Sequence, residues 1–406
     1  MTGSLLFRNA AVLDIDQGQY AEADIRVVDG RIADVDTGLR ADDGPTVDLK
    51  GAHVLPGLID AHVHVTAATA DLADLRSWHP SYVALHAARA MGDMLDRGFT
   101  TVRDTGGADF GLSDAQAEGL IRGPRLMFAG KAISQTGGHG DDRSRGQSAY
   151  DGGSCCAGMS QIADGVDAVR LAARHELRRG ATHLKVMASG GVASPTDRVD
   201  STGYSQEELR AVVEEATAAN RYVAAHAYTA RAVNRALSAG VRSIEHGNLI
   251  DETSVELFRQ HDAFLVMNLV TYWALQAEGR DHGMSDRSWR KVVDVLEGGY
   301  RALELAARAG LPIAYGTDLL GGMRKHQNKE FEIRADFQPA LDIIRSATTV
   351  GARLVNMPGE IGCVTPGAYA DLIVIDRNPL DDVRVLAAPD KFRCVVAGGE
   401  IVSSRE

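Results

Sequence analysis

Two histidines stand one residue apart at the end of an apolar run in "GLIDAHVHV" (residues 57–65). Because alternate residues of a β-strand share a face, His62 and His64 would point the same way and could bind one metal ion. Imidazoles and charged groups follow several later apolar runs as well, although an unpaired one is costly to bury. A lone strand histidine is more often an ordinary core residue, so the argument rests on coincidence. Together these side chains predict a metal site with the ligands His62, His64, Lys185, His226, His246 and Asp318.

Lys185 is the unusual member of this set, because a cationic ammonium repels a divalent metal. Addition of CO2 to its amine would make a carboxylate that can bridge two ions. If Lys185 instead pairs with a carboxylate of the protein, the site is expected to hold a single ion. The residues alone leave both interpretations open.

The predicted ligands need a scaffold that brings the ends of several strands together. From about residue 55 to residue 355, short apolar runs are separated by amphipathic stretches such as 205–220, which opens with a capping box. Strands are expected at 57–64, 99–104, 125–130, 183–189, 222–227, 242–247, 263–269 and 312–318. Eight β-then-α units predict an α/β fold, the (β/α)8 TIM barrel, whose functional residues lie at the C-terminal ends of the strands.

Both ends of the chain are rich in short strands, unlike the middle. Asp29-Gly30 and Gly398-Gly399 stand between apolar runs and predict tight hairpin turns.

Other stretches of the sequence have two interpretations each. The long connection from 130 to about 160 covers the substrate or is a solvated loop, and the charge run from 324 to 327 lies over the pocket or faces solvent. Tyr272 and Trp273 line the pocket or pack a helix start, and Arg103 and Asp104 are candidates for supporting the ligands.

Bulk composition narrows the class of protein. The 406 residues carry a formal net charge of −12, which disfavours nucleic acid as a partner. No apolar run is long enough to cross a membrane, and the N-terminal stretch does not look like a secretory signal, so a cytoplasmic location is expected. The four cysteines, Cys155 and Cys156 among them, are too few for a disulfide framework.

With these residues assembled, the chain resembles the amidohydrolase superfamily. The resemblance is carried by "PGLIDAHVHV", the lysine in "HLKVMASGG", the histidines in "AAHAY" and "IEHGN", the aspartate in "YGTD" and the closing "PGAYADLIVID". Within it, "TGGHGD" and "AHAYT" are similar to the dinuclear branch of prolidase-like carboxypeptidases, lysine and arginine carboxypeptidases and ochratoxin-type amidases. Imidazolonepropionase is a more distant relative that lacks the bridging lysine. The resemblance implies that residues 1–55 and 359–406 form one small β-sandwich beside a hydrolase barrel spanning residues 56–358.

The resemblance also implies a role for each candidate residue. His62, His64 and Asp318 would bind the more buried of two divalent ions, His226 and His246 would bind the second, and N6-carboxylated Lys185 would bridge them. Zinc is the expected metal, although manganese or cobalt would accept the same ligands. Asp318 would act as general base and then general acid, Tyr228 would polarise the scissile carbonyl, and His139 would hold a substrate carboxylate.

These roles predict a metal-dependent hydrolase that cleaves amide bonds of N-acyl amino acids or dipeptides by attack of a metal-bridging hydroxide. The alternative is a hydrolase of aryl carbamates, ureas or cyclic amides on the same dinuclear site. A non-catalytic relative would be expected to have lost ligands, and a mononuclear deaminase would not need Lys185. We further expect a small-molecule substrate with a free carboxylate and a homo-oligomeric protein.

Overall fold

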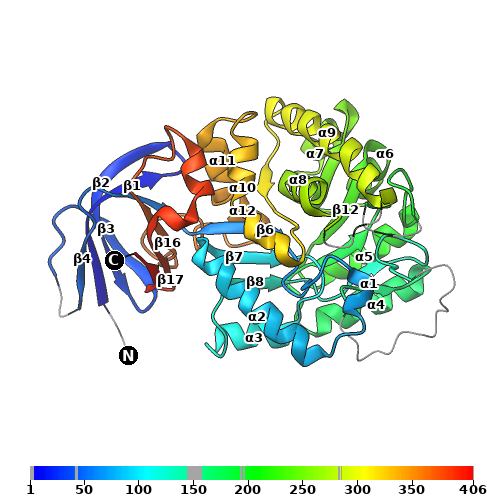
Figure 1. Cartoon of the computed structure of the whole chain (residues 1–406), viewed down its shortest axis with the longest axis horizontal. Coiled ribbons are helices and arrows are strands. Elements are labelled where there is room, and N and C mark those ends of the chain that lie inside the picture. The colour runs from blue at the N-terminus through cyan, green and yellow to red at the C-terminus, as the bar shows by residue number, and fades with distance from the viewer. Residues whose placement is uncertain are drawn as a thin grey trace.

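The computed structural model describes residues 4–41, 44–143, 158–192, 194, 197–281, 284 and 286–405. Its strands alternate with helices from residue 58 onward, and the prediction of a (β/α)8 barrel is confirmed (Figure 1). Each expected strand has its counterpart: β6 (Leu58–Val63), β7 (Phe99–Asp104), β8 (Arg125–Phe128), β11 (Leu184–Met187), β12 (Val223–Thr229), β13 (Ser243–Leu249), β14 (Phe264–Met267) and β15 (Ile313–Tyr315). Two short strands that we did not predict, β9 (Ala132–Ser134) and β10 (Ser160–Ile162), lie in the long connection, of which residues 144–157 are outside the described part.

The barrel strands pair in parallel within two sheets, β6-β7-β8 and β10-β9-β11-β12-β13-β14-β15. Backbone hydrogen bonds join these sheets at two seams. At one seam the N–H of Thr182 donates to the carbonyl of Phe128 over 2.9 Å. At the other, the N–H of Asp318 donates to the carbonyl of His62 over 2.8 Å. The second seam therefore joins two of the predicted ligands.

Helices cover the outside of these strands, as Figure 1 shows for the cyan-to-yellow part of the chain. Their apolar faces pack against outward side chains of the strands, such as Val186, Ala225 and Ile244, in one buried cluster. The predicted capping box of α5 is confirmed, with Ser205 and Glu208 as its two members. The helices are α1 (Leu72–Leu75), α2 (Pro80–Asp96), α3 (Phe110–Ala117), α4 (Val166–Arg178), α5 (Gln206–Ala218), α6 (Ala230–Ser238), α7 (Glu252–Gln260), α8 (Leu269–Glu278), α9 (Asp286–Arg308), α10 (Lys329–Arg334), α11 (Ala340–Ser346) and α12 (Thr349–Leu354), with the 3-10 turns η2 (Gly321–His326), η3 (Val383–Ala387) and η4 (Pro389–Lys391).

Strands from both ends of the chain form one sheet beside the barrel (blue and red in Figure 1). Its members are β1 (Ser4–Asp14), β2 (Gln19–Val28), β3 (Arg31–Asp36), β4 (Thr46–Asp48), β5 (His53–Pro56), β16 (Leu372–Ile375), β17 (Phe392–Ala397) and β18 (Glu400–Ser404). The two ends meet where β5 pairs antiparallel with β16, Val54 opposite Val374. Both predicted hairpin turns are confirmed, and Asp29 and Gly30 have the positive φ values of 50° and 78° that such a turn requires. The domain boundaries at 55/56 and 358/359 stay a prediction.

The terminal sheet has its own core, which includes Phe7, Ile25, Val54 and Val374. A second cluster, with Leu58 of β6 and Ile373 of β16, joins the sheet to the barrel.

Among the described residues, no helix is long and apolar enough to span a membrane. Cys363 and Cys394 are free thiols, whereas Cys155 and Cys156 lie outside the described residues.

Candidate active site

The six predicted ligands come from five strand ends and converge at one end of the barrel. His62 lies in β6 with His64 just after it, Lys185 lies in β11, His226 in β12, His246 in β13, and Asp318 follows β15. The ligand atoms of His62, His246 and Asp318 all lie within 4.8 Å of one another. The Oδ1 of Asp318 is 3.2 Å from Nε2 of His64 and 3.5 Å from Nε2 of His62. The rings of His226 and His246 are centred 4.5 Å apart.

Hydrogen bonds on the far side of each ring orient three of the histidines. The Nδ1 of His62 contacts Oε2 of Glu245 at 2.7 Å, and the Nδ1 of His64 contacts the carbonyl of Gly106 at 2.8 Å. The Nδ1 of His246 lies 3.0 Å from Oδ1 of Asn268. An acceptor at Nδ1 places the proton there and leaves the Nε2 lone pair directed at the shared space, as in metal-binding histidines. His226 is turned the other way, because its Nε2 contacts the carbonyl of Gly190 at 3.1 Å.

The charge states of His62 and Asp318 also fit a metal ion. Burial, with Lys185 nearby, lowers the pKa of His62 to about 4, so its imidazole is neutral. Burial favours the neutral form of Asp318 too, but the surrounding histidines outweigh it and lower the pKa of this carboxyl. Metal ligands must be deprotonated. The donor set therefore suits a divalent cation.

Lys185 is 2% exposed and makes no hydrogen bond or ion pair with the described residues. Burial lowers the pKa of its amine to about 8, against the opposing effect of Glu245 and Asp318. A buried amine without an acceptor is unfavourable in an ordinary core. This environment fits the carboxylated form of the side chain, because a lower pKa increases the fraction of neutral amine, which is the form that reacts with CO2.

Two of the candidate ligands have strained backbones. His246 has φ of 78° and Asp318 has φ of 52°, in the left-handed region that residues other than glycine seldom adopt. In a regular strand, His246 and its neighbour Glu245 would point to opposite faces. In this barrel both lie close to His62, with Glu245 bonded to its Nδ1 and the His246 ring centred 5.2 Å away. Strain of this kind concentrates at functional sites.

Buried acids behind the ligands were missed by sequence reasoning. Glu245 is fully buried and is held at Oε1 by Nη2 of Arg103 over 2.6 Å. Asp60, also fully buried, accepts from the N–H of His62 at 3.1 Å and from both the N–H and the hydroxyl of Thr317. The signal was a charged residue inside an apolar run. Local sequence does not tell which distant residue such a charge meets.

Of the two residues flagged at the end of β7, both support the site. The Arg103 side chain also donates from Nε to the carbonyl of Ala61 at 2.6 Å. The Oδ2 of Asp104 accepts from the N–H of Val65 at 2.7 Å, and its Oδ1 accepts from the N–H of Gly106 at 2.9 Å. These bonds fix the segments on either side of His64.

Tyr228 and His139 lie against the second group of histidines. The ring of His139 stacks on that of His226, with centroids 4.1 Å apart, and the Tyr228 ring meets His226 edge-on at 4.8 Å. The Nδ1 of His139 donates to Oγ of Ser194 over 3.1 Å, because the Ser194 hydroxyl itself donates to Asp197, so a ring protonated at Nε2 as well could donate to a ligand there. Tyr228 is 2% exposed, and burial raises its pKa, so the hydroxyl stays protonated.

A cavity of about 90 Å³ reaches the candidate site at three of its side chains. His64, His139 and Asp318 are on its wall. The rest of the lining is largely apolar, and it consists of Leu72, Ala132, Gly140, Asp142, Met159, Ser160, Met187 and Leu320. A small organic molecule bound there would contact an apolar surface on one side and the candidate ligands on the other.

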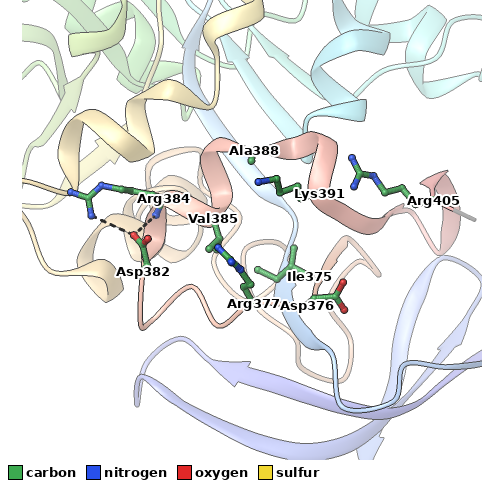
Figure 2. Close-up of a pocket in the computed structure, with 9 residues that line it drawn as sticks. All are labelled: Ile375, Asp376, Arg377, Asp382, Arg384, Val385, Ala388, Lys391 and Arg405. Atoms are coloured by element: carbon green, nitrogen blue, oxygen red, sulfur yellow. Dashed lines mark hydrogen bonds and ion pairs between the residues drawn. The ribbon is translucent and has the colours of Figure 1, made fainter.

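A second cavity, of about 400 Å³, lies in the C-terminal segment and includes none of the predicted ligands. Figure 2 shows that Arg377, Lys391 and Arg405 come from different parts of that segment, while Arg384 is paired with Asp382. These side chains are exposed. No histidine and none of the predicted metal ligands is among the described residues that line this second cavity.

Comparison with known proteins agrees with the geometry. The amidohydrolase family model matches residues 53–402. Ochratoxinase from Aspergillus niger is 33% identical over 86% of this chain and 75% of its own length. A prolidase crystallised with N-methylphosphonate-L-proline is 45% identical, with a TM-score of 0.97 over 99% of this chain and 100% of that one. A Xaa-Pro dipeptidase with methionine bound in its active site is 28% identical, with a TM-score of 0.87 over 98% and 99% of the two chains.

The chain belongs to the amidohydrolase family, as its metal-ligand pattern and barrel indicated. It is therefore a hydrolytic enzyme that acts on C–N bonds. Enzymes of this family are typically metal-dependent, and the cluster of His62, His246 and Asp318 provides a place for a metal ion.

Proposed function

We propose that this protein is a dinuclear metal hydrolase that releases an amino acid from dipeptides or N-acyl amino acids with a free carboxylate. The observation that carries the proposal is that Asp318 and His139 line the same cavity. A substrate in it can place its amide beside Asp318 while its carboxylate meets His139. The likeness to a prolidase and a Xaa-Pro dipeptidase supports this substrate class.

In this proposal the chain's own groups have separate tasks. Asp318 takes a proton from the attacking water at its carboxylate and returns it to the leaving amine. The hydroxyl of Tyr228 donates a hydrogen bond to the carbonyl oxygen as negative charge develops there. His62, His64, His226, His246, Asp318 and carboxylated Lys185 would hold two divalent ions, for which we propose Zn²⁺. When bound, the ions supply Lewis acidity and make water acidic enough to be deprotonated near neutral pH.

The substrate class is tested by measuring amine release from zinc-loaded protein on dipeptides and N-acyl amino acids, each paired with its C-terminal amide. We expect turnover of the free acids and little turnover of the amides. Equal turnover of both members of each pair would reject the carboxylate requirement.

A second candidate is hydrolysis of aryl carbamates, ureas or cyclic amides, which the apolar lining of Leu72, Met159, Met187 and Leu320 favours. Activity on that group together with silence on every dipeptide and N-acyl amino acid would establish this alternative instead.

His139→Ala is expected to raise KM for free acids by about 10-fold or more, because a bound carboxylate would hold the ring protonated at Nε2, and hydrogen bonds to charged groups contribute about 1.5–3 kcal/mol. KM for neutral substrates should change much less. The control is His261→Ala, which alters an exposed residue that caps α7 away from the cavity. An equal rise in KM for acids and neutral substrates would refute the carboxylate contact.

Removal of metal should abolish turnover, and Zn²⁺, Mn²⁺ or Co²⁺ should restore it.

The lysine modification has a test of its own. Protein prepared with ¹³C-bicarbonate should show a carbamate carbon resonance that Lys185→Ala lacks. Absence of that resonance in fully active wild-type protein would eliminate the bridging carboxylate. The cytoplasmic location and homo-oligomeric state expected from the sequence stay predictions, which cell fractionation and light scattering would test.

A further inference from the structure

The first turn of α8 contacts the site although no predicted ligand comes from this helix or from β14. Asn268, at the N-cap of α8, lies against His246, and the hydroxyl of Thr271 donates to the carbonyl of Asp318 over 2.8 Å. The hydroxyl of Tyr272 lies 2.8 Å from Nδ1 of His246 and donates to the hydroxyl of Tyr228 over 3.0 Å. Tyr272 is 1% exposed. It therefore connects a candidate metal ligand to the group proposed to polarise the carbonyl.

The direction of these hydrogen bonds follows from the available protons. The Oδ1 of Asn268 can only accept, so Nδ1 of His246 carries a proton. Facing that N–H, the oxygen of Tyr272 is an acceptor as well. The single phenolic hydrogen of Tyr272 is then free to point to Tyr228, which is the direction that the structure has.

At the end of this series of hydrogen bonds, the Tyr228 hydroxyl accepts more hydrogen bonds than it donates. Its oxygen accepts from Tyr272 and has the backbone of Val192 beside it. A phenol whose lone pairs are engaged keeps its own hydrogen for another partner. That partner would be the substrate carbonyl, because the Tyr228 ring lies against both His226 and His246.

We propose that Tyr272 is a positioning residue that orders the hydroxyl of Tyr228, in a directed chain from His246 Nδ1–H through Tyr272 to Tyr228. The chain points the Tyr228 hydrogen at the substrate and strengthens it as a donor, since successive hydrogen bonds polarise one another. It costs little reorganisation during the reaction, because all three side chains are at most 2% exposed. This inference rests on the proposed role of Tyr228 and adds a residue to it.

The test is a double-mutant cycle on metal-loaded enzyme with Tyr228→Phe, Tyr272→Phe and the double variant. Tyr228→Phe should lower kcat by about 100-fold or more, as for loss of a donor to a developing oxyanion. Tyr272→Phe should lower kcat by about 10-fold with KM nearly unchanged, since it removes one hydrogen bond but leaves Tyr228 in place. In the double variant kcat should equal that of Tyr228→Phe, because Tyr272 acts only through Tyr228.

Two further readouts separate positioning from a structural effect. Affinity for a tetrahedral phosphonate analogue of the substrate should fall in Tyr272→Phe, while metal content should not change because Asn268 still orients His246. Tyr300→Phe is the matched control, since the Tyr300 ring stacks on Phe337 and its hydroxyl makes no hydrogen bond with the described residues.

Each other outcome decides against a stated idea. If Tyr228→Phe keeps wild-type kcat, the proposed role of Tyr228 is wrong. If Tyr228→Phe is slow but Tyr272→Phe is not, or if the two effects multiply in the double variant, the Tyr272 inference is wrong while Tyr228 stands. Loss of metal in Tyr272→Phe would also overturn it, because Tyr272 would then act through His246.

Discussion

Asp318→Asn is expected to lower kcat by about 10²- to 10⁴-fold, the range that general acid–base catalysis contributes. The amide keeps the shape of the side chain but cannot accept and return a proton. The backbone should tolerate the change, because asparagine is among the residues that best adopt the φ of 52° found here. Turnover under saturating metal, with metal content measured on the same sample, checks the prediction.

Asp142→Asn provides the matched control for this experiment. Asp142 lines the same cavity but is ion-paired with Arg76 at 2.6 Å. It should retain kcat within about threefold, because its carboxylate is already paired with Arg76 and is not one of the candidate ligands. An Asp318→Asn enzyme that binds metal fully and turns over nearly as fast as wild type would exclude the acid–base role.

Glu245→Ala is expected to lower the free energy of unfolding by about 3–5 kcal/mol, because it leaves the buried guanidinium of Arg103 without its partner. It should also weaken metal binding about 10- to 100-fold, since the Nδ1 of His62 loses the carboxylate that sets its tautomer. Urea unfolding of the metal-free protein measures the first effect, and competition with a chromophoric chelator measures the second.

A double variant, Arg103→Met with Glu245→Leu, separates these two effects. Replacing a buried ion pair by apolar residues of similar size restores stability in other proteins. Stability should therefore recover in large part, whereas metal affinity should stay low because His62 still lacks an acceptor. Wild-type metal affinity in either variant would contradict the role assigned to Glu245.

Much of the fold and the ligand positions could be predicted because their signals are local. A two-residue period marks a strand, a turn pair marks a hairpin, and a polar residue at the end of an apolar run marks a barrel rim. The HxH pair and Asp318 are visible in this way. The short β9 and β10 are not, since three residues set no period.

The parts of the site that could not be predicted depend on partners far away in the sequence. Glu245 is next to a predicted ligand, but its guanidinium partner is Arg103, 142 positions earlier in the chain. Arg324 was expected over the pocket or in solvent, yet it is 8% exposed and donates to the carbonyls of His64 and Val65. A charged side chain is expected to be exposed. Arg324 is buried because the folded barrel places two backbone carbonyls where they accept its hydrogen bonds.

The candidate metal site is complete only where the first barrel strand, β6, meets the last, β15. The carbonyl of His62 accepts from the N–H of Asp318, and Asp60 accepts from the hydroxyl of Thr317, which is 257 positions away. A nascent chain that ends before β15 carries five of the candidate ligands but has neither Asp318 nor the seam that aligns His62. An ion bound across this junction stabilises only the closed form, by a free energy that grows with metal concentration. A metal ion held by these residues would therefore link its own binding to the pairing of the first and last barrel strands.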